Sequence, residues 1–131
     1  MGLSVVDASV LIAAIDSRDS CHQSAARELA TTRQQHDLLL PAVAFSEALV
    51  IPYSIGMQEG RAVERQLRAL GRIHPITDAI AARAAQIRAG RQVKLPDALV
   101  LATGAELRAS EVLTFDQRWH SLAPNVRVLT P

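Results

Sequence analysis

Short apolar runs alternate with longer segments of helical character along the chain, and this alternation restricts the fold more than any other feature. The apolar runs have the length of buried strands. They predict strands over residues 3–7, 37–41, 72–76, 111–114 and 125–130. Strands that alternate with helices favour a parallel sheet with helices on both faces. The sequence therefore predicts an α/β fold, a three-layer α/β/α sandwich with a central, mostly parallel sheet.

The remaining segments have the composition and spacing of helices. We predict helices over residues 8–15, 20–34, 42–56, 58–71, 77–90 and 96–109. Ser9 is available as a cap near the start of the first helix, and Thr77 is the expected N-cap of the fifth. Pro52 is expected to kink or end the third helix, with Gly56 closing it, and Gly90 is expected just after the fifth.

The length of 131 residues suits one domain, residues 1–131, with a substantial core. Cys21 is the only cysteine, which excludes a disulfide framework and a cysteine-based zinc site and fits a reducing cytoplasm. The N-terminus lacks the features of a signal peptide. The longest apolar stretch, residues 38–52, contains Glu47 and two prolines and is too short to span a bilayer. We therefore expect a cytoplasmic protein with no membrane partner.

Four carboxylates stand in apolar surroundings, where an unpaired charge is costly. Asp7 and Asp116 each follow a predicted strand, Asp97 begins a predicted helix, and Glu47 lies within an apolar helix. In a parallel sheet the strands end, and the following helices begin, at the same edge. We therefore expect the three aspartates to converge at that edge, with Glu47 reaching in from a flanking helix.

Each of these carboxylates also has a structural interpretation when it is taken alone. Asp7 and Asp116 can cap the helical turns that follow them. Asp97 lies in a first helical turn, where the helix dipole favours a negative charge. Glu47 can occupy a plain surface position. The four residues together favour a functional site, but the sequence leaves each single alternative open.

A cluster of carboxylates needs a cation unless its members are protonated, because like charges raise each other's pKa. An all-oxygen set without histidine or cysteine suits a hard ion, Mg²⁺ or Mn²⁺. Such ions commonly act on phosphates, whose charge they neutralise, and they activate water for attack. The sequence therefore predicts a magnesium or manganese site for phosphate chemistry.

Four segments carry a resemblance to a known family: VVDASVLIA at 5–13, SEAL at 46–49, KLPDALVLATGAEL at 94–107 and VLTFDQRW at 112–119. With these segments in this order, the whole chain resembles a PIN domain. It is especially similar to the VapC-type toxin ribonucleases of type II toxin–antitoxin pairs.

The resemblance implies a site and a reaction. Its catalytic acids map onto Asp7, Glu47, Asp97 and Asp116, and the three aspartates would be the metal ligands. Ser9 and Thr114 match hydroxyl residues that support the metal site. The implied activity is a Mg²⁺- or Mn²⁺-dependent endoribonuclease, in which metal-activated water cleaves an RNA phosphodiester and leaves a 5′-phosphate and a 3′-hydroxyl.

The resemblance also implies partners and a location. It implies a homodimer in a bacterial or archaeal cytoplasm and a cognate VapB-type antitoxin whose tail blocks the site. An arginine of that antitoxin is expected near Asp7, Asp97 and Asp116, because its planar fork can meet carboxylates bidentately. Residues 48–57 have more apolar surface than one core face needs, and we expect them to line the antitoxin groove.

Basic residues give a weaker signal. Setting the four carboxylates aside leaves 14 basic against 9 acidic side chains. Arg91 and Lys94 precede Asp97 closely and are the better candidates for substrate contact. Four arginines share one predicted helical stripe, which is either a solvated face or a contact line for RNA phosphates. They are Arg61, Arg65, Arg68 and Arg72.

Other classes fit the residues less well. A phosphatase of the haloacid dehalogenase type needs a second aspartate where Ser9 stands, and a phosphoacceptor receiver domain needs an acid pair near Asp7. A dinucleotide-binding domain needs a glycine-rich first turn, which is absent after Asp7. A catalytically silent PIN-like module that binds RNA or protein remains the alternative to the ribonuclease.

Overall fold

The structure is a computed structural model, and it describes residues 2–131. Its strands are β1 (Gly2–Val6), β2 (His36–Pro41), β3 (Arg72–His74), β4 (Glu111–Thr114) and β5 (Val126–Val128). Its α-helices are α1 (Ala8–Ile15), α2 (His22–Arg33), α3 (Ala42–Ile55), α4 (Met57–Leu70), α5 (Asp78–Gly90) and α6 (Leu95–Glu106). A single 3₁₀ turn, η1 (Gln117–Trp119), follows β4.

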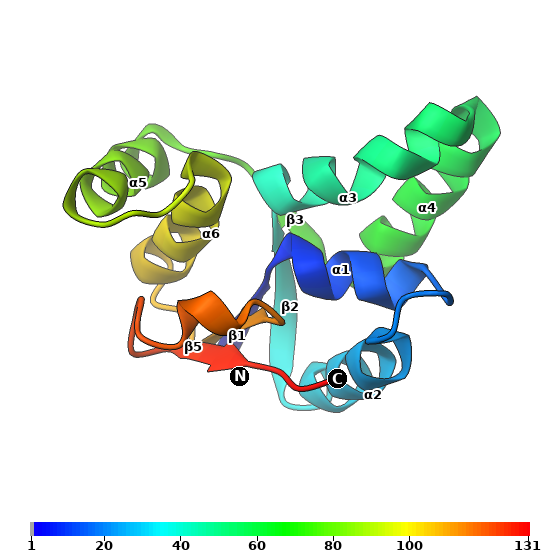
Figure 1. The fold of residues 1–131 in the computed structure, drawn as a ribbon, viewed down its shortest axis with the longest axis horizontal. Coiled ribbons are helices and arrows are strands. Elements are labelled where there is room, and N and C mark those ends of the chain that lie inside the picture. The colour runs from blue at the N-terminus through cyan, green and yellow to red at the C-terminus, as the bar shows by residue number, and fades with distance from the viewer. Residues whose placement is uncertain (1) are drawn as a thin grey trace.

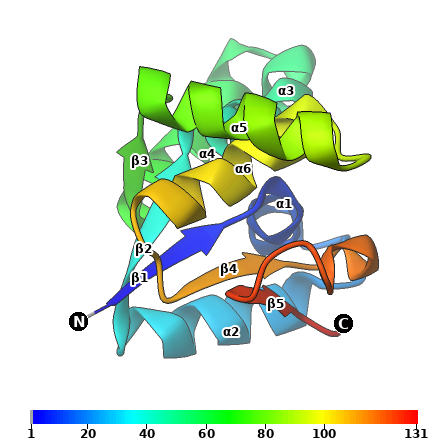
Figure 2. The same ribbon diagram turned by 90° about the vertical axis from the view of Figure 1, so that its left-hand side faces the viewer.

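The five strands form one parallel sheet in the order β3-β2-β1-β4-β5. The central strands are apolar and fully buried, as in Val5, Leu39 and Val112, because helices cover both faces of the sheet. Figure 2 shows α2 on one side of β1 and β4, and α5 and α6 on the other. The predicted three-layer α/β/α fold is therefore confirmed. Because all strands are parallel, their carboxyl ends lie at one edge of the sheet.

Four of the α-helices form two packed pairs, α3 with α4 and α5 with α6 (Figure 1). The α3–α4 pair extends to one side of the molecule, and the α5–α6 pair lies on the other. Gly104 lets α6 approach β4 closely, because a Cβ at this position would lie 2.6 Å from Val112 Cγ2. The start of α6 is thereby held near the carboxyl edge of the sheet. Within residues 2–131 every helix is too short or too polar to cross a membrane.

Several local predictions need correction. Helix α3 continues through Pro52 to Ile55, so it does not end at the proline, and Gly56 follows it as predicted. Gly90 is the last residue of α5 rather than the residue after it. Thr77 caps α5 as predicted, since its hydroxyl accepts from the Ile80 N–H (3.1 Å). Helix ends fray, and a boundary one residue away is within their usual variation.

Candidate active site

Asp7 directly follows β1 at the carboxyl edge of the sheet and is buried, with 6% of its surface exposed. Its backbone N–H donates to the Leu113 carbonyl (2.9 Å), which extends the contact between β1 and β4. Its side chain makes no capping hydrogen bond to α1. Instead, Asp7 Oδ2 accepts from the hydroxyls of Ser9 and Thr114, each at 2.8 Å. Asp7 is thus the N-cap residue of α1 by position, but capping does not account for the hydroxyls that its side chain binds.

The backbone after β4 aims these two hydroxyls at Asp7. The Phe115 N–H donates to Ser9 Oγ (3.0 Å), and the Asp116 N–H donates to Thr114 Oγ1 (3.0 Å). Because each hydroxyl oxygen accepts a backbone proton, its own proton is directed to the carboxylate. Ser9 lies inside α1, so it is not the expected cap of that helix but a donor to Asp7. Burial raises the pKa of Asp7, and the hydrogen bonds from Ser9 and Thr114 oppose this shift only in part.

Asp97 lies in the first turn of α6, where Pro96 favours helix initiation. Burial, followed by the negative charges of Asp7 and Asp116, raises its pKa. Glu47 lies on α3 and is the most exposed of the four carboxylates. Partial burial and then the charges of Asp7 and Asp97 raise its pKa. Asp7, Glu47 and Asp97 are therefore within electrostatic reach of one another, although they come from separate elements.

Asp116 has a different environment, because a cation of the protein already holds it. Arg118 Nη2 donates to Asp116 Oδ2 (2.7 Å) and Arg118 Nε donates to Oδ1 (3.0 Å). The Arg118 backbone N–H also donates to Oδ1 (3.0 Å), so Asp116 caps η1 as its structural interpretation predicted. The bonds from Arg118 hold the pKa of Asp116 below its ordinary value.

The four carboxylates have the chemistry of a site for a hard divalent cation. Their ligand atoms are all oxygen, and the charges of Asp7, Glu47 and Asp97 have no ion-pair partner among the salt bridges of residues 2–131. In the same described residues, no three acidic, histidine or cysteine side chains are arranged to hold a metal ion as they stand. The donor set fits Mg²⁺ or Mn²⁺. A metal ion held by three of these carboxylates would therefore require side-chain movement.

A basic rim borders Asp97. Lys94 and Arg118 line one small cleft together with Asp97, and the positive charges of both oppose the rise in the pKa of Asp97. Arg91 lies beside this cleft, and its Nη1 donates to the Ser121 carbonyl (3.1 Å). Of the two basic residues predicted from the sequence, Lys94 thus lies beside the carboxylates and Arg91 lies at their periphery. Sequence reasoning missed Arg118, for which the only signal was its position two residues after Asp116.

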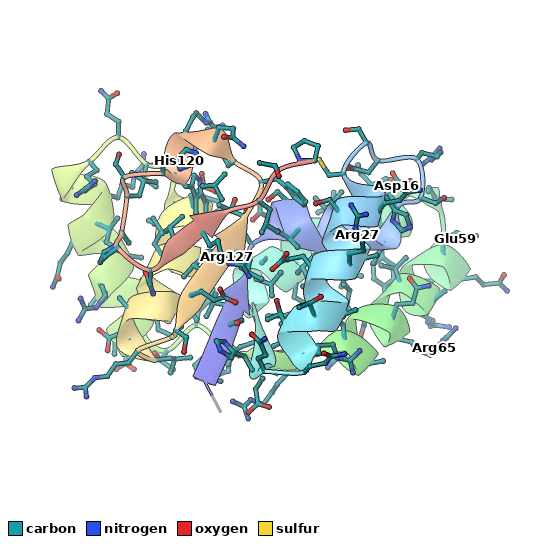
Figure 3. All side chains as sticks on the ribbon, turned by 90° about the horizontal axis from the view of Figure 1, so that it is seen from below. Asp16, Arg27, Glu59, Arg65, His120 and Arg127 are labelled. Carbon is teal, nitrogen blue, oxygen red and sulfur yellow. The ribbon has the colours of Figure 1, made fainter. Side chains whose placement is uncertain are left out.

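The arginine stripe does not join this site. Arg68 and Arg72 line a cleft with His36, and His36 and Arg72 begin β2 and β3 at the opposite edge of the sheet. Arg68 also pairs with Glu64 (3.0 Å). Figure 3 shows Arg65 on the far side of the molecule from His120, which directly follows η1. The Arg68 and Arg72 end of the stripe is therefore remote from the carboxylates, and Arg72 lies in β3 rather than on the predicted helix.

An apolar groove begins at Glu47 and runs between α1, α3 and α4. Its walls include Ile51 and Ile55, which are 65% and 66% exposed. Asp16 and Glu59 border the same groove, and Figure 3 shows them at one end of the molecule. Residues 48–57 do contribute groove-lining side chains, as the sequence predicted.

Solved structures with the same fold include proteins of toxin–antitoxin systems. The chain is 25% identical to a chain of a toxin–antitoxin complex from Klebsiella pneumoniae, with a TM-score of 0.75 and coverage of 95% of this chain and 96% of that one. It is 20% identical to VapC20 of Mycobacterium tuberculosis, a toxin that cleaves the sarcin–ricin loop, with a TM-score of 0.79 and coverage of 97% and 99%. For DNA-bound VapBC from Salmonella typhimurium the identity is 18%, the TM-score 0.75 and the coverage 98% and 97%.

The sequence comparison agrees with the structural one. No curated protein matches the sequence. The model of the PIN domain family, however, matches residues 4–124, which include all four carboxylates. The family predicted from the sequence motifs is thus confirmed, and the chain belongs to the PIN domain family.

Proposed function

We propose that this chain is a metal-dependent endoribonuclease and acts as the toxin of a toxin–antitoxin pair. One observation carries the proposal: Asp7 is buried, held by two hydroxyls, and accompanied by Asp97 and Glu47, and none of the three has an ion-pair partner within residues 2–131. A buried carboxylate without a cation destabilises the fold, and binding of a positively charged ligand would remove this cost. Membership of the PIN family and the fold shared with toxin–antitoxin proteins support the same function.

The proposed ligands of the ion are Asp7, Asp97 and Asp116. When bound, Mg²⁺ or Mn²⁺ would neutralise phosphate charge and lower the pKa of a water molecule. Ser9 and Thr114 would hold the Asp7 carboxylate in one orientation throughout. Glu47 is exposed, and its raised pKa makes its carboxylate a stronger base, so it is suited to accept a proton during attack. The products would carry a 5′-phosphate and a 3′-hydroxyl.

Substrate contact is proposed for two residues of the basic rim, Lys94 and Arg91. Lys94 lies beside Asp97, where its ammonium group would meet an RNA phosphate as a point charge. Arg91 would make a more peripheral contact. Arg68 and Arg72 lie at the opposite edge of the sheet, too remote to contact the phosphate that is cleaved, so we assign the arginine stripe no catalytic role.

The apolar groove is the proposed docking site of a VapB-type antitoxin. Its exposed isoleucines suit an amphipathic segment, and its Glu47 end leads that segment to the carboxylates. An arginine of the antitoxin would meet Asp7 and Asp97, which form no salt bridge with any of residues 2–131. We also propose a homodimer, with the outer face of α3 at Phe45 and Val50 as one contact surface.

The first prediction tests the activity. Purified protein should cleave total RNA with added Mg²⁺ or Mn²⁺, lose this activity in excess chelator and regain it when either ion is restored. Asp97→Asn should abolish cleavage, whereas Asp78→Asn should not, because Asp78 lies in the first turn of α5. Mapping of the cut ends checks the expected 5′-phosphate and 3′-hydroxyl.

Full cleavage in excess chelator would contradict the metal-dependent mechanism. Binding of RNA without any cleavage, with or without added metal, would instead identify the catalytically silent PIN-like module. A reaction that proceeds equally in wild type and Asp97→Asn would show that the carboxylates are not the catalytic site.

A further inference from the structure

Arg118 is the one cation that binds a carboxylate of the candidate site in the described residues. Its guanidinium engages both oxygens of Asp116, through Nη2 at 2.7 Å and Nε at 3.0 Å. Two parallel bonds of this kind are the strongest form of arginine–carboxylate contact. Both oxygens of this proposed metal ligand are thus occupied by a side chain of the same protein.

This arrangement separates Asp116 from the other three carboxylates. The pKa values of Asp7, Glu47 and Asp97 are raised, whereas that of Asp116 is lowered by its bonds to Arg118. Arg118 also lies beside Asp97, because both side chains line the same small cleft. The positive charge of Arg118 therefore lies next to Asp116 and Asp97, where a divalent ion would also be attracted.

The Arg118 side chain is nevertheless free to leave. It is 77% exposed, compared with 22% for Asp116. Within residues 2–131 every hydrogen bond of its side chain goes to Asp116. Exposed ion pairs are weak, because solvent and salt screen the charges and ordering the long side chain is unfavourable. Although the contact is bidentate, it is open to solvent, so a cation that binds Asp116 has one exposed ion pair to displace, while the backbone N–H of Arg118 can stay on Oδ1.

We propose that Arg118 is an internal counter-ion of the candidate metal site, which occupies Asp116 in the metal-free protein and is displaced when a divalent cation binds. The proposal rests on the proposed metal-dependent function and adds to it a residue that lowers metal affinity. Arg118 is a positioning residue, because it acts through Asp116 and not on the substrate.

The chain offers a matched control for this pair. Asp16 and Arg18 have the same spacing, and the Arg18 backbone N–H (3.0 Å) and Nε (3.2 Å) both donate to Asp16 Oδ1. This second pair lies at the far end of α1 from Asp7. Substituting either arginine by glutamine removes one exposed ion pair, but only Arg118→Gln frees a proposed metal ligand.

The experiment measures Mn²⁺ binding by titration calorimetry and by electron paramagnetic resonance, without RNA. Arg118→Gln should bind Mn²⁺ about two- to fivefold more tightly than wild type, which is the range expected for loss of an exposed competing ion pair. Arg18→Gln should bind like wild type. Arg118→Lys should fall between the two, because lysine keeps the charge but cannot form the bidentate contact. The difference between wild type and Arg118→Gln should shrink as ionic strength rises.

Equal or weaker Mn²⁺ binding by Arg118→Gln, with its circular dichroism unchanged, would overturn the proposal. So would the same increase in affinity in Arg18→Gln, because the effect would then reflect net charge alone. Failure of the proposed function has a different signature. In that case wild type and Arg118→Gln either do not bind Mn²⁺ or bind it just as well when Asp97→Asn is added.

Discussion

Asp97→Asn removes one negative charge from the candidate active site and preserves the size of the side chain. Asp97 is half-buried in the first turn of α6, and burial and the charges of Asp7 and Asp116 raise its pKa. In the metal-free protein this carboxylate therefore opposes folding at neutral pH. We expect the substitution to stabilise the metal-free fold while it abolishes RNA cleavage.

The size of the effect follows from the surroundings of Asp97. Each half-exposed repulsion contributes about 0.2–1 kcal/mol after solvent screening, and Asp97 has two such neighbours in Asp7 and Asp116. Loss of a favourable charge at the start of α6 costs about 0.3–1 kcal/mol. The substitution also removes the attractions of Asp97 to Lys94 and Arg118, and their loss offsets a further part of the relieved repulsion. These gains and losses nearly cancel, so the net gain comes mainly from relief of the burial of the charge, the largest cause of the raised pKa; it is on the order of 0.5 kcal/mol, which raises Tm by roughly 2 °C.

Thermal unfolding in the presence of a chelator measures this gain, with Asp78→Asn as the control. Asp78 also lies in a first helical turn but is exposed and remote in sequence from the four carboxylates. Its substitution removes only the helix-dipole interaction and should lower stability by about 0.3–1 kcal/mol. The opposite signs of the two variants separate charge repulsion from helix capping.

The pH dependence provides a second check. Because the folded-state pKa of Asp97 lies above its ordinary value of 3.8, the penalty is absent at low pH, where the carboxyl is protonated in both states. It develops as pH rises through 3.8 towards the folded-state pKa and is complete above that. The Tm difference between Asp97→Asn and wild type should be largest at pH 7 and disappear below 3.8. A loss of stability at pH 7 similar to that of Asp78→Asn would refute the repulsion and show that Asp97 acts mainly through the helix dipole.

Two further predictions concern the opposite edge of the sheet and the partner. Glu111 is partly buried, but its bonds to Arg127 (2.8 Å) and Ser4 (2.7 Å) hold its pKa below 4.5. Glu111→Gln should therefore lower stability by about 1–2 kcal/mol at pH 7, and chemical denaturation should show the loss fading as pH falls below 4.5; a loss that persists there would exclude the charge as its cause. Alanine in place of the antitoxin's inhibitory arginine should restore RNA cleavage more than it weakens binding, since groove contacts persist; a variant that still inhibits fully would contradict this.

The sequence was sufficient for the layers of the fold and for the location of the acids. Strand and helix lengths with their periodicity indicate a parallel sheet, and in such a sheet Asp7 and Asp97 must come to the same edge because strands end where helices begin. These inferences do not depend on side-chain contacts, so the hydrophobic pattern of the sequence is sufficient for them. The motif resemblance then identified the family that the comparison confirmed.

The tertiary structure decided what each polar side chain contacts. Ser9 is a donor to Asp7 and not a helix cap, because the Phe115 N–H reaches it from β4, 106 residues away in sequence. Asp116 is held by Arg118, so it differs from Asp7 although both acids follow a predicted strand. Such contacts depend on which strands are neighbours and on side-chain geometry, and hydrophobic periodicity encodes neither.

The basic residues illustrate the same division. Helical spacing correctly placed Arg65 and Arg68 on one helix, α4, but gave no information on the edge of the sheet that this helix approaches. That edge depends on the direction in which α4 returns to β3, and it turns out to be the one opposite Asp7. Sequence alone thus determined the fold class and the acids of this protein, whereas only the packing of the helices on the sheet decided which cations lie close enough to act on them.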